Sequence, residues 1–116
     1  MEVRRIVSNV AASDLQKADA FYKEVLGLQT LMDLGWIRTY GSGSTMPIQV
    51  SIASQGGSGT AVPDMSIEVD DVEDALRKVR KAGIPIEYGP ATETWGVRRF
   101  FVRDPFGKLV NILQHA

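Results

Sequence analysis

The feature that most constrains the fold of this chain is a pattern of predicted elements that occurs twice. Each copy consists of one strand, one helix and three further strands, and a Gly/Ser-rich segment, SQGGSGTAVP (54–63), separates the copies. An internal repeat of this kind predicts two similar supersecondary units. For a chain of 116 residues, we expect a single domain at 1–116. It would consist of a first module at about 1–53, a flexible linker at 54–63 and a second module at about 64–116.

Two segments have the apolar spacing of amphipathic helices. The first, SDLQKADAFYKEVLG, has a capping-box pattern at Ser13 and Gln16 and predicts a helix at about 14–26. The second, DDVEDALRKVRKAG, has acidic residues in its first turn and basic residues in its last, as the helix dipole prefers. We expect Asp70 or Asp71 to cap this second helix. The two helices would end at Gly27 and Gly83, and the apolar stripe of the second consists of Val72, Ala75, Leu76 and Val79.

The remaining elements are predicted as strands, since apolar and polar residues alternate along them. In PIQVSIA (47–53), for example, Val50 and Ile52 lie on one face, and Gln49 and Ser51 lie on the other. The other predicted strands are RRIVSNVA (4–11), QTLMDL (29–34), WIRTYG (36–41), DMSIEV (64–69), IPIEYG (84–89), WGVRRFFVR (95–103) and KLVNILQ (108–114), with a loop, GSGSTM, at 41–46 and a turn at 104–107.

The composition excludes several classes of function. The formal net charge is -1, which gives no electrostatic reason to expect a nucleic acid or a membrane as partner. The chain has no Cys, so disulfides and thiolate sites are excluded. Its single His is His115, in a tail where fraying is expected. No signal peptide and no apolar run of about 20 residues is present, so we expect a cytoplasmic protein.

The two modules match one another in the order and spacing of a few marker residues, whereas the overall sequence identity between them is low. The matched pairs are Asp14 with Asp71, Gly27 with Gly83, Trp36 with Trp95, and Gln49 with Asn111. Together with the opening AASDLQKADAFYKEVLGL and the closing FFVRDPFGKLVNILQ, this repeat resembles the vicinal oxygen chelate superfamily. That superfamily includes glyoxalase I, extradiol dioxygenases, and the fosfomycin and bleomycin resistance proteins.

The resemblance implies an α+β fold in which two βαβββ modules form a curved mixed sheet around a cleft. The helices would lie outside, and two chains would form a homodimer with shared clefts. One face of each strand would pack on the helices and the other would line the cleft. The helix-facing sets would be Ile48/Val50/Ile52, Met65/Ile67/Val69 and Val110/Ile112.

The resemblance also implies four positions that bind the metal in metal-dependent members. In this chain these positions are Val7, Gln49, Asp64 and Asn111. Val7 has no ligand atom, the two amides bind transition metals weakly, and Asp64 is the one good oxygen ligand. We therefore expect no cofactor and no catalytic metal, although a weakly held divalent ion such as Mg²⁺ stays open.

Within the superfamily, the closing segment is nearest to the bleomycin resistance proteins. The match consists of Trp95-Gly96, Arg98, Phe100 and the Asp-Pro-x-Gly turn, and it departs at Lys108. Aromatic and charged side chains would form the cleft walls. The residues predicted to line it are Trp36, Arg38, Tyr40, Gln49, Ser51, Asp64, Ser66, Glu68, Trp95, Arg98, Arg99, Phe101 and Asn111. Arg98 and Arg99 are adjacent, so one at most reaches the cleft, and the sequence leaves open which.

These observations predict a protein that binds a small aromatic or amphipathic molecule, with antibiotics among the candidates, and that holds no catalytic metal. The alternative is a divalent-metal-dependent lyase or dioxygenase with Asp64 as a ligand. Two further alternatives are a metal-free enzyme with Asp64 or Glu68 as general base, and an interaction module with an occluded cleft. The sequence assigns no catalytic residue and does not identify the ligand.

Overall fold

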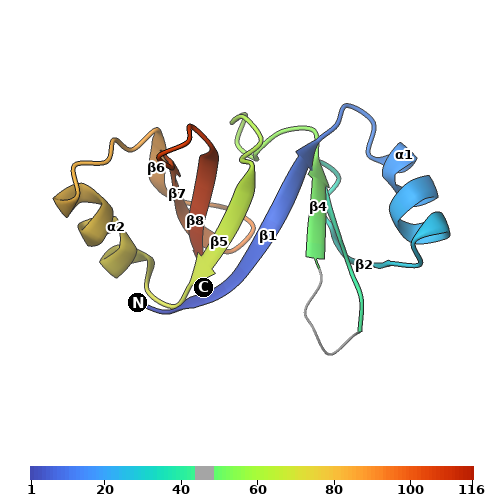
Figure 1. The fold of residues 1–116 in the computed structure, drawn as a ribbon, viewed down its shortest axis with the longest axis horizontal. Helices are drawn as coiled ribbons and strands as arrows, with labels where there is room; N and C mark the ends of the chain where they lie inside the picture. The colour runs from blue at the N-terminus through green and yellow to red at the C-terminus, as the bar shows by residue number, and fades with distance from the viewer. Residues whose placement is uncertain (44–48) are drawn as a thin grey trace. The chain divides into compact units, whose positions relative to one another are not determined.

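The computed structural model describes residues 1–43 and 49–116, which divide into two compact units. We call Val7–Val62 the N-terminal unit, and Met1–Ile6 together with Pro63–Ala116 the C-terminal unit. The fold is α+β, and each unit contains one βαβββ module (Figure 1). The predicted loop residues 44–46 and the first two residues of the strand predicted at 47–53, Pro47 and Ile48, lie outside the described residues.

The N-terminal unit has the strand order β2-β3-β4-β1. Strand β4 pairs antiparallel with β3 and parallel with the second half of β1, where Val10 lies opposite Ile52. Its elements are β1 (Val3–Ala11, whose first residues belong to the C-terminal unit), α1 (Gln16–Ala18), η1 (Asp19–Val25), β2 (Gln29–Asp33), β3 (Ile37–Gly41) and β4 (Gln49–Ala53).

The C-terminal unit has the strand order β5-β8-β7-β6, in which β5 and β8 are parallel and the other neighbours are antiparallel. Its elements are β5 (Met65–Val69), α2 (Val72–Lys81), β6 (Tyr88–Thr92), β7 (Val97–Arg103) and β8 (Leu109–His115). The strand predicted at 84–89 therefore begins four residues later, at Tyr88. Ile84 and Pro85 instead belong to the connection after α2, where the Ile84 N–H donates to the Val79 carbonyl.

The helix predicted at about 14–26 differs from the prediction in its type. Only Gln16–Ala18 is an α-helix, and Asp19–Val25 is a π-helix. The helix start has no capping box, because the Asp14 carboxylate and not Ser13 accepts the Gln16 N–H, at 3.0 Å. Apolar pairs at i and i+4 do not separate α from π turns, since such residues lie on one face in both.

Helix α2 confirms the prediction for the second helix. Asp71 is its N-cap, and the carboxylate accepts the Asp74 N–H at 3.0 Å. The stripe is buried at Val72, Ala75 and Leu76, which pack on one face of the β5–β8–β7 sheet. Figure 1 shows α2 beside these strands. Buried residues of that face include Phe100, Val102 and Val110, and Met65, Ile67 and Ile112 pack against them. The residues on this face include the helix-facing sets that the alternation predicts for β5 and β8.

The predicted flexible linker at 54–63 is a hydrogen-bonded loop. The Gly56 N–H donates to the Thr60 carbonyl at 2.8 Å, and the Gly59 N–H donates to the Gln55 side chain at 2.9 Å. A Cβ atom at Gly56 would lie 2.1 Å from the Ala61 carbonyl oxygen. The glycines therefore permit close backbone approach here, a use of Gly that composition does not distinguish from flexibility.

The turn predicted at 104–107 is confirmed. The Gly107 N–H donates to the Asp104 carbonyl at 3.1 Å, and the Asp104 carboxylate accepts the N–H groups of Phe106 and Lys108. Within the described part of the chain, no helix has both the length and the apolar character needed to cross a membrane.

Candidate functional site

The sheet of the C-terminal unit has two chemically different faces. Phe100 and Val102 of β7 point to α2 and belong to the core. Because successive strand residues point to opposite faces, Arg99 and Phe101 lie on the side away from α2. Asn111 is paired with Phe101 across β7 and β8, and paired residues share a face. We call the side away from α2 the open face of this unit, because α2 does not cover it, although Arg99, Phe101 and Asn111 are buried there.

Arg99 is the centre of a cluster on the open face. Its guanidinium carbon lies 5.0 Å from the ring centroid of Trp95, 4.8 Å from that of Phe101 and 5.2 Å from that of Tyr88. Arg99 is 3% exposed, and its Nη2 is 3.1 Å from Oε2 of Glu93, which is also buried. We call Tyr88, Glu93, Trp95, Arg99 and Phe101 the arginine cluster.

Glu93 holds the arginine cluster together. One carboxylate oxygen pairs with Arg99, and the other accepts the Tyr88 hydroxyl at 2.8 Å. A buried charge is costly unless it has an opposite charge and a hydrogen-bond partner. The Glu93 carboxylate is both the counter-ion and a hydrogen-bond acceptor for the Arg99 guanidinium. The three aromatic rings of the cluster therefore surround a guanidinium whose orientation is fixed by Glu93, and cation–π attraction favours this arrangement.

Arg98 lies on the other face, and its predicted place in a ligand cleft is corrected. Its guanidinium pairs with Glu73 of α2, and Nη1 is 3.2 Å from the Thr92 hydroxyl. The arginine that lies on the open face is Arg99, a choice that the sequence leaves open.

A polar pair lies next to the arginine cluster on the open face. Asn111 is 6% exposed, and its Nδ2 donates to Oγ of Ser66 at 3.1 Å. Its Oδ1 is buried and accepts no hydrogen bond from any residue within 1–43 and 49–116. Buried amide oxygens are nearly always hydrogen-bonded, so this acceptor is an exception that needs an explanation.

The two predicted cleft acids, Asp64 just before β5 and Glu68 within it, have structural partners. Glu68 lies between two bases: one carboxylate oxygen is 2.9 Å from Nε of Arg5 and the other is 2.9 Å from Nδ1 of His115. Asp64 is exposed, and its carboxylate accepts the Leu109 N–H at 2.8 Å. His115 is therefore the last residue of a strand and has an acidic partner, whereas the sequence predicts a frayed tail.

In the N-terminal unit, Ser51 lies on the predicted face away from the helix, and its Oγ is 2.6 Å from Oγ1 of Thr39. The face predicted for Tyr40 is wrong. Tyr40 is fully buried in the helix-side core with Leu15, Ala18 and Ile52, and it stacks on Tyr22 with 5.6 Å between ring centroids. Its register explains this, because Tyr40 is paired with Val50 of the helix-facing set.

Arg38 is also on the helix side, so its predicted place in a cleft wall is corrected. It pairs with Asp33 at 3.0 Å and with Asp19 of η1 at 3.2 Å. Asp19 also accepts the Tyr40 hydroxyl. That hydrogen bond and the Arg38 charge hold the pKa of Asp19 below its ordinary value. Burial and the bond to Asp19 raise the pKa of Tyr40.

The last two predicted residues of this unit are partly buried. Trp36 precedes β3, and its carbonyl accepts the Ser54 N–H at 2.9 Å. Gln49 is the first residue of β4 and shares a face with Ser51 by strand alternation. Both have interactions with the chain, and a role for either in ligand binding stays a prediction.

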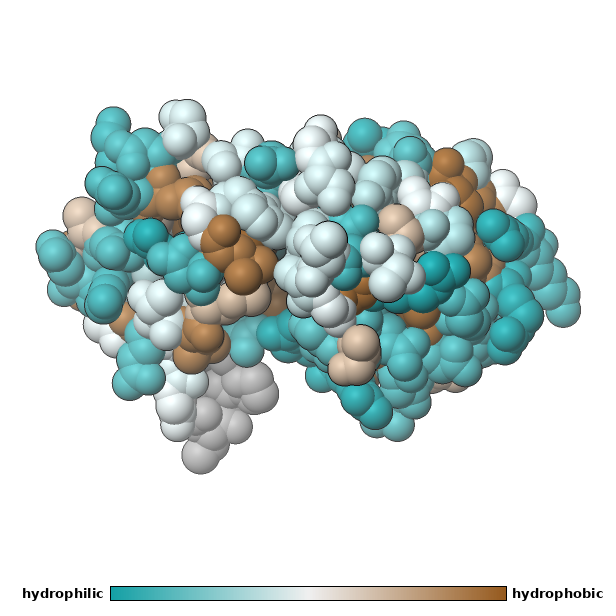
Figure 2. Space-filling view, turned by 180° about the vertical axis from the view of Figure 1, so that it is seen from behind, coloured by the Kyte–Doolittle hydropathy of each residue, from teal (hydrophilic) through white to brown (hydrophobic). Residues whose placement is uncertain are grey.

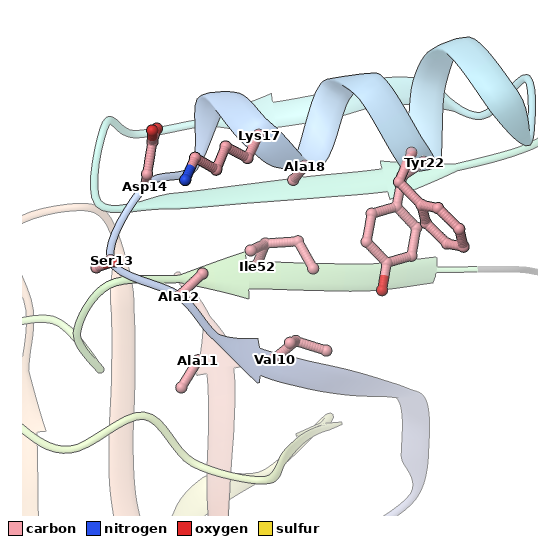
Figure 3. Close-up of a pocket in the computed structure, with 10 residues that line it drawn as sticks. Val10, Ala11, Ala12, Ser13, Asp14, Lys17, Ala18, Tyr22 and Ile52 are labelled. Carbon is pink, nitrogen blue, oxygen red and sulfur yellow. The ribbon is translucent and has the colours of Figure 1, made fainter.

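The N-terminal unit also has a groove that the sequence does not predict. It lies between the helical segment and strands β1 and β4 and has a volume of about 500 Å³ (Figure 3). One end is polar, and the rest is formed by small apolar and aromatic side chains. Its lining residues are Val10, Ala11, Ala12, Ser13, Asp14, Lys17, Ala18, Phe21, Tyr22 and Ile52. None of them is among the residues predicted to line a cleft.

The four positions marked by the resemblance do not fit a transition metal. Val7 is a buried hydrocarbon, and the Asp64 carboxylate already accepts a backbone N–H. Asn111 uses its amide nitrogen on Ser66, and a neutral amide is a weak ligand for transition ions. Among the described residues, no three His, Asp or Glu side chains gather where they could hold an ion.

Sequence reasoning missed Tyr88, Glu93 and Thr39. Thr39 has an alternation signal, because it lies in a predicted strand between the chosen residues Arg38 and Tyr40. Tyr88 lies in the strand predicted at 84–89, from which no cleft residue was chosen. Glu93 has no alternation signal: it lies in the connection between β6 and β7, and only the fold brings it to Arg99.

Comparisons with known proteins agree with this architecture. A family model described as the Glyoxalase/Bleomycin resistance protein/Dioxygenase superfamily matches residues 5–112. A search of curated proteins found no match. Among solved structures, a methylmalonyl-CoA epimerase from Mycobacterium tuberculosis is similar at 21% identity and a TM-score of 0.64, over 98% of this chain and 87% of that one.

Two further structures are similar over nearly the whole chain. A superfamily member from Vibrio splendidus 12B01 has 17% identity and a TM-score of 0.67, over 99% of this chain and 100% of that one. A protein described as an NAD-dependent benzaldehyde dehydrogenase from Legionella pneumophila has 16% identity and a TM-score of 0.77, over 97% and 100%. At these identities the similarity shows the fold, and it carries no activity over to this chain.

Proposed function

Since this chain belongs to the glyoxalase/bleomycin resistance protein/dioxygenase superfamily, we propose that it binds a small aromatic or amphipathic molecule without a catalytic metal. The observation that carries the proposal is the open face of the C-terminal unit. There, three aromatic rings surround Arg99, and the Ser66–Asn111 pair lies beside them. Ligand sites in proteins are mostly apolar and aromatic, with a few polar groups that set the orientation of the ligand.

The geometry favours a flat ligand. Trp95 is half-buried, so part of its ring surface is available for stacking, while Arg99 beneath it is held by Glu93. An aromatic ligand would gain ring–ring contact and the attraction of a nearby cation. The role of the site would then be ligand recognition, with antibiotics and aromatic metabolites as the ligand classes to test.

Isothermal titration of the protein against planar aromatic compounds, both antibiotics and metabolites, tests the proposal. We expect at least one compound to bind, and Trp95→Ala to weaken that binding about tenfold, since the large energies of an interface lie in a few aromatic anchors. Phe106→Ala is the control, because Phe106 is 85% exposed on the 104–107 turn. A panel without any binder, or equal effects of both variants, would contradict the proposal.

The metal-dependent lyase or dioxygenase is the competing function. It requires a stoichiometric divalent ion in the purified protein, which elemental analysis of the same preparation measures. The donor chemistry at Val7, Gln49, Asp64 and Asn111 argues against such an ion, and a stoichiometric transition metal would overturn this part of the proposal.

We also propose that two copies of the chain form a homodimer. Apolar side chains remain on the surface of the N-terminal unit, where Figure 2 shows hydrophobic patches. Phe21 is 53% exposed and Val25 is 71% exposed, although both lie in the helical segment. Extended apolar surface of this kind marks an interface in many soluble proteins.

A further inference from the structure

Asn111 carries the one side-chain amide oxygen that is buried and accepts no hydrogen bond within residues 1–43 and 49–116. The side chain is 6% exposed, and its nitrogen is fixed by the 3.1 Å bond to Ser66. Phe101 lies opposite it on β7, and Leu113 follows it on the same face of β8. A polar acceptor is thus held in an apolar setting, in a fixed orientation, beside the arginine cluster.

We propose that Oδ1 of Asn111 accepts a hydrogen bond from an N–H or O–H group on the edge of the bound molecule. The inference rests on the proposed function and narrows the ligand class. The ligand is a flat aromatic molecule with a donor on its rim, and rings whose rim is fully alkylated are rejected. The acceptor is enclosed in the free chain, so binding requires rotation of neighbouring side chains, and such rotations are common at interfaces.

The energetic argument depends on the cost of an unpaired acceptor. A buried polar group without a partner destabilises the free protein, whereas a ligand donor relieves that cost on binding. A ligand that lacks the donor leaves the acceptor buried and unpaired in the complex as well. Sites built around a hydrogen bond therefore discriminate strongly against analogues that lack the group. Asn111 would determine specificity more than it contributes to overall affinity.

A purely structural role for Asn111 and a ligand-binding role predict opposite effects of its replacement on the stability of the free protein. If the amide were fully paired inside the protein, for example through an enclosed water molecule, its replacement by an apolar residue would destabilise the fold. If the oxygen waits for a ligand, Asn111→Leu removes an unpaired acceptor together with the hydrogen bond to Ser66. The gain from the first offsets the loss of the second, and the free protein loses little or no stability. The two roles therefore differ in a measurement that needs no ligand.

The first experiment compares indole with 1-methylindole, which differ by one N–H donor. Both are titrated into the wild-type chain and followed by the chemical shifts of backbone amides in β7 and β8. We expect the wild type to bind indole at least about tenfold more tightly than 1-methylindole. Asn111→Leu should abolish this preference, and Asn111→Asp, which retains an acceptor, should keep it. An equal preference in wild type and Asn111→Leu would overturn the inference and leave the proposed function intact.

The second experiment measures thermal unfolding of the free wild-type chain and of Asn111→Leu. We expect the variant to unfold at the same temperature or higher. A midpoint lower by more than about 5 °C, which corresponds to about 1 kcal/mol in a domain of this size, would overturn the inference. If neither indole binds, the result counts against the proposed function, and the unfolding comparison alone decides the role of Asn111.

Discussion

At the scale of single residues, burial of a charge decides how much its partner matters. Arg99 and Glu93 have side chains that are 3% and 5% exposed, and they pair at 3.1 Å. Arg103 and Glu87 pair at a similar distance, 3.0 Å, but their side chains are 50% and 42% exposed. Water screens the second pair and has little access to the first, so the two pairs form an internal comparison.

Glu93→Ala should destabilise the chain by about 3 kcal/mol, because it leaves the Arg99 guanidinium buried without this counter-ion. Glu87→Ala should cost less than about 1 kcal/mol, as exposed pairs do. Chemical denaturation, with the midpoint and slope fitted for each variant, measures both. Equal losses in the two variants would show that the arginine cluster does not depend on its carboxylate.

At the scale of elements, η1 is joined to β3 by charge as well as by packing. The Asp19 carboxylate of η1 binds both the Tyr40 hydroxyl and Arg38 of β3. The pKa of Asp19 is therefore lowered from 3.8, and the pKa of Tyr40 is raised from 10.0. The Asp19 contribution to stability is complete above pH 3.8 and is lost as the pH falls through the lowered value. The Tyr40 contribution is complete below pH 10.0 and is lost as the pH rises through the raised value.

Tyr40→Phe should therefore lower the unfolding midpoint at neutral pH. It should also remove the part of the stability loss above pH 10 that comes from Tyr40 ionisation. Below pH 3.8 the loss of stability should be smaller, since the Asp19 carboxylate then lacks its main hydrogen-bond donor. Circular dichroism melts across the pH range measure this. Tyr22→Phe is the matched control, because the Tyr22 ring stacks on Tyr40 while its hydroxyl has no hydrogen bond among the described residues. Identical pH profiles in the two variants would contradict the role of the Asp19 pair.

At the scale of the whole molecule, the two modules differ in how they cover their helices. The stripe of α2 is buried at three of its four positions, whereas the helical segment of the N-terminal unit leaves Phe21, Val25 and Leu26 exposed. Two copies of one architecture thus bury their helices to different extents. The apolar surface left on the helical segment of the N-terminal unit is the reason we expect the chain to form a homodimer.

Light scattering after size exclusion should give about twice the 12.7 kDa mass of one chain. Phe21→Glu should shift the protein toward the mass of a single chain, because a carboxylate in an apolar interface is costly. Lys23→Glu changes charge at an exposed position of the same helical segment and should leave the dimer intact. A wild-type chain that stays monomeric at about 100 µM, above the Kd of most obligate dimers, would contradict the proposal.

The sequence predicted the modules, the second helix and the 104–107 turn, because each depends on local chemistry: apolar periodicity, a capping Asp, and an Asx-type turn. It predicted the face of Phe101 less directly, through alternation with core residues, and it left open which of Arg98 and Arg99 shares that face. It failed at Arg38 and Tyr40, since WIRTYG puts an Ile and a Thr on one face and an Arg and a Tyr on the other. Neither set is clearly apolar, and pairing of Tyr40 with Val50 decided the question.

What the sequence determined by itself is therefore the periodic part of the protein: the repeat, the strands and the residue types at the four marked positions, which do not suit a metal. Only the tertiary structure decided which charges meet. Glu93 reaches Arg99 from a connection, His115 reaches Glu68 from a neighbouring strand, and the oxygen of Asn111 is left buried without a described partner. The reason is physical: periodicity sets which way a side chain points, whereas contacts between distant segments depend on register and on which strands become neighbours.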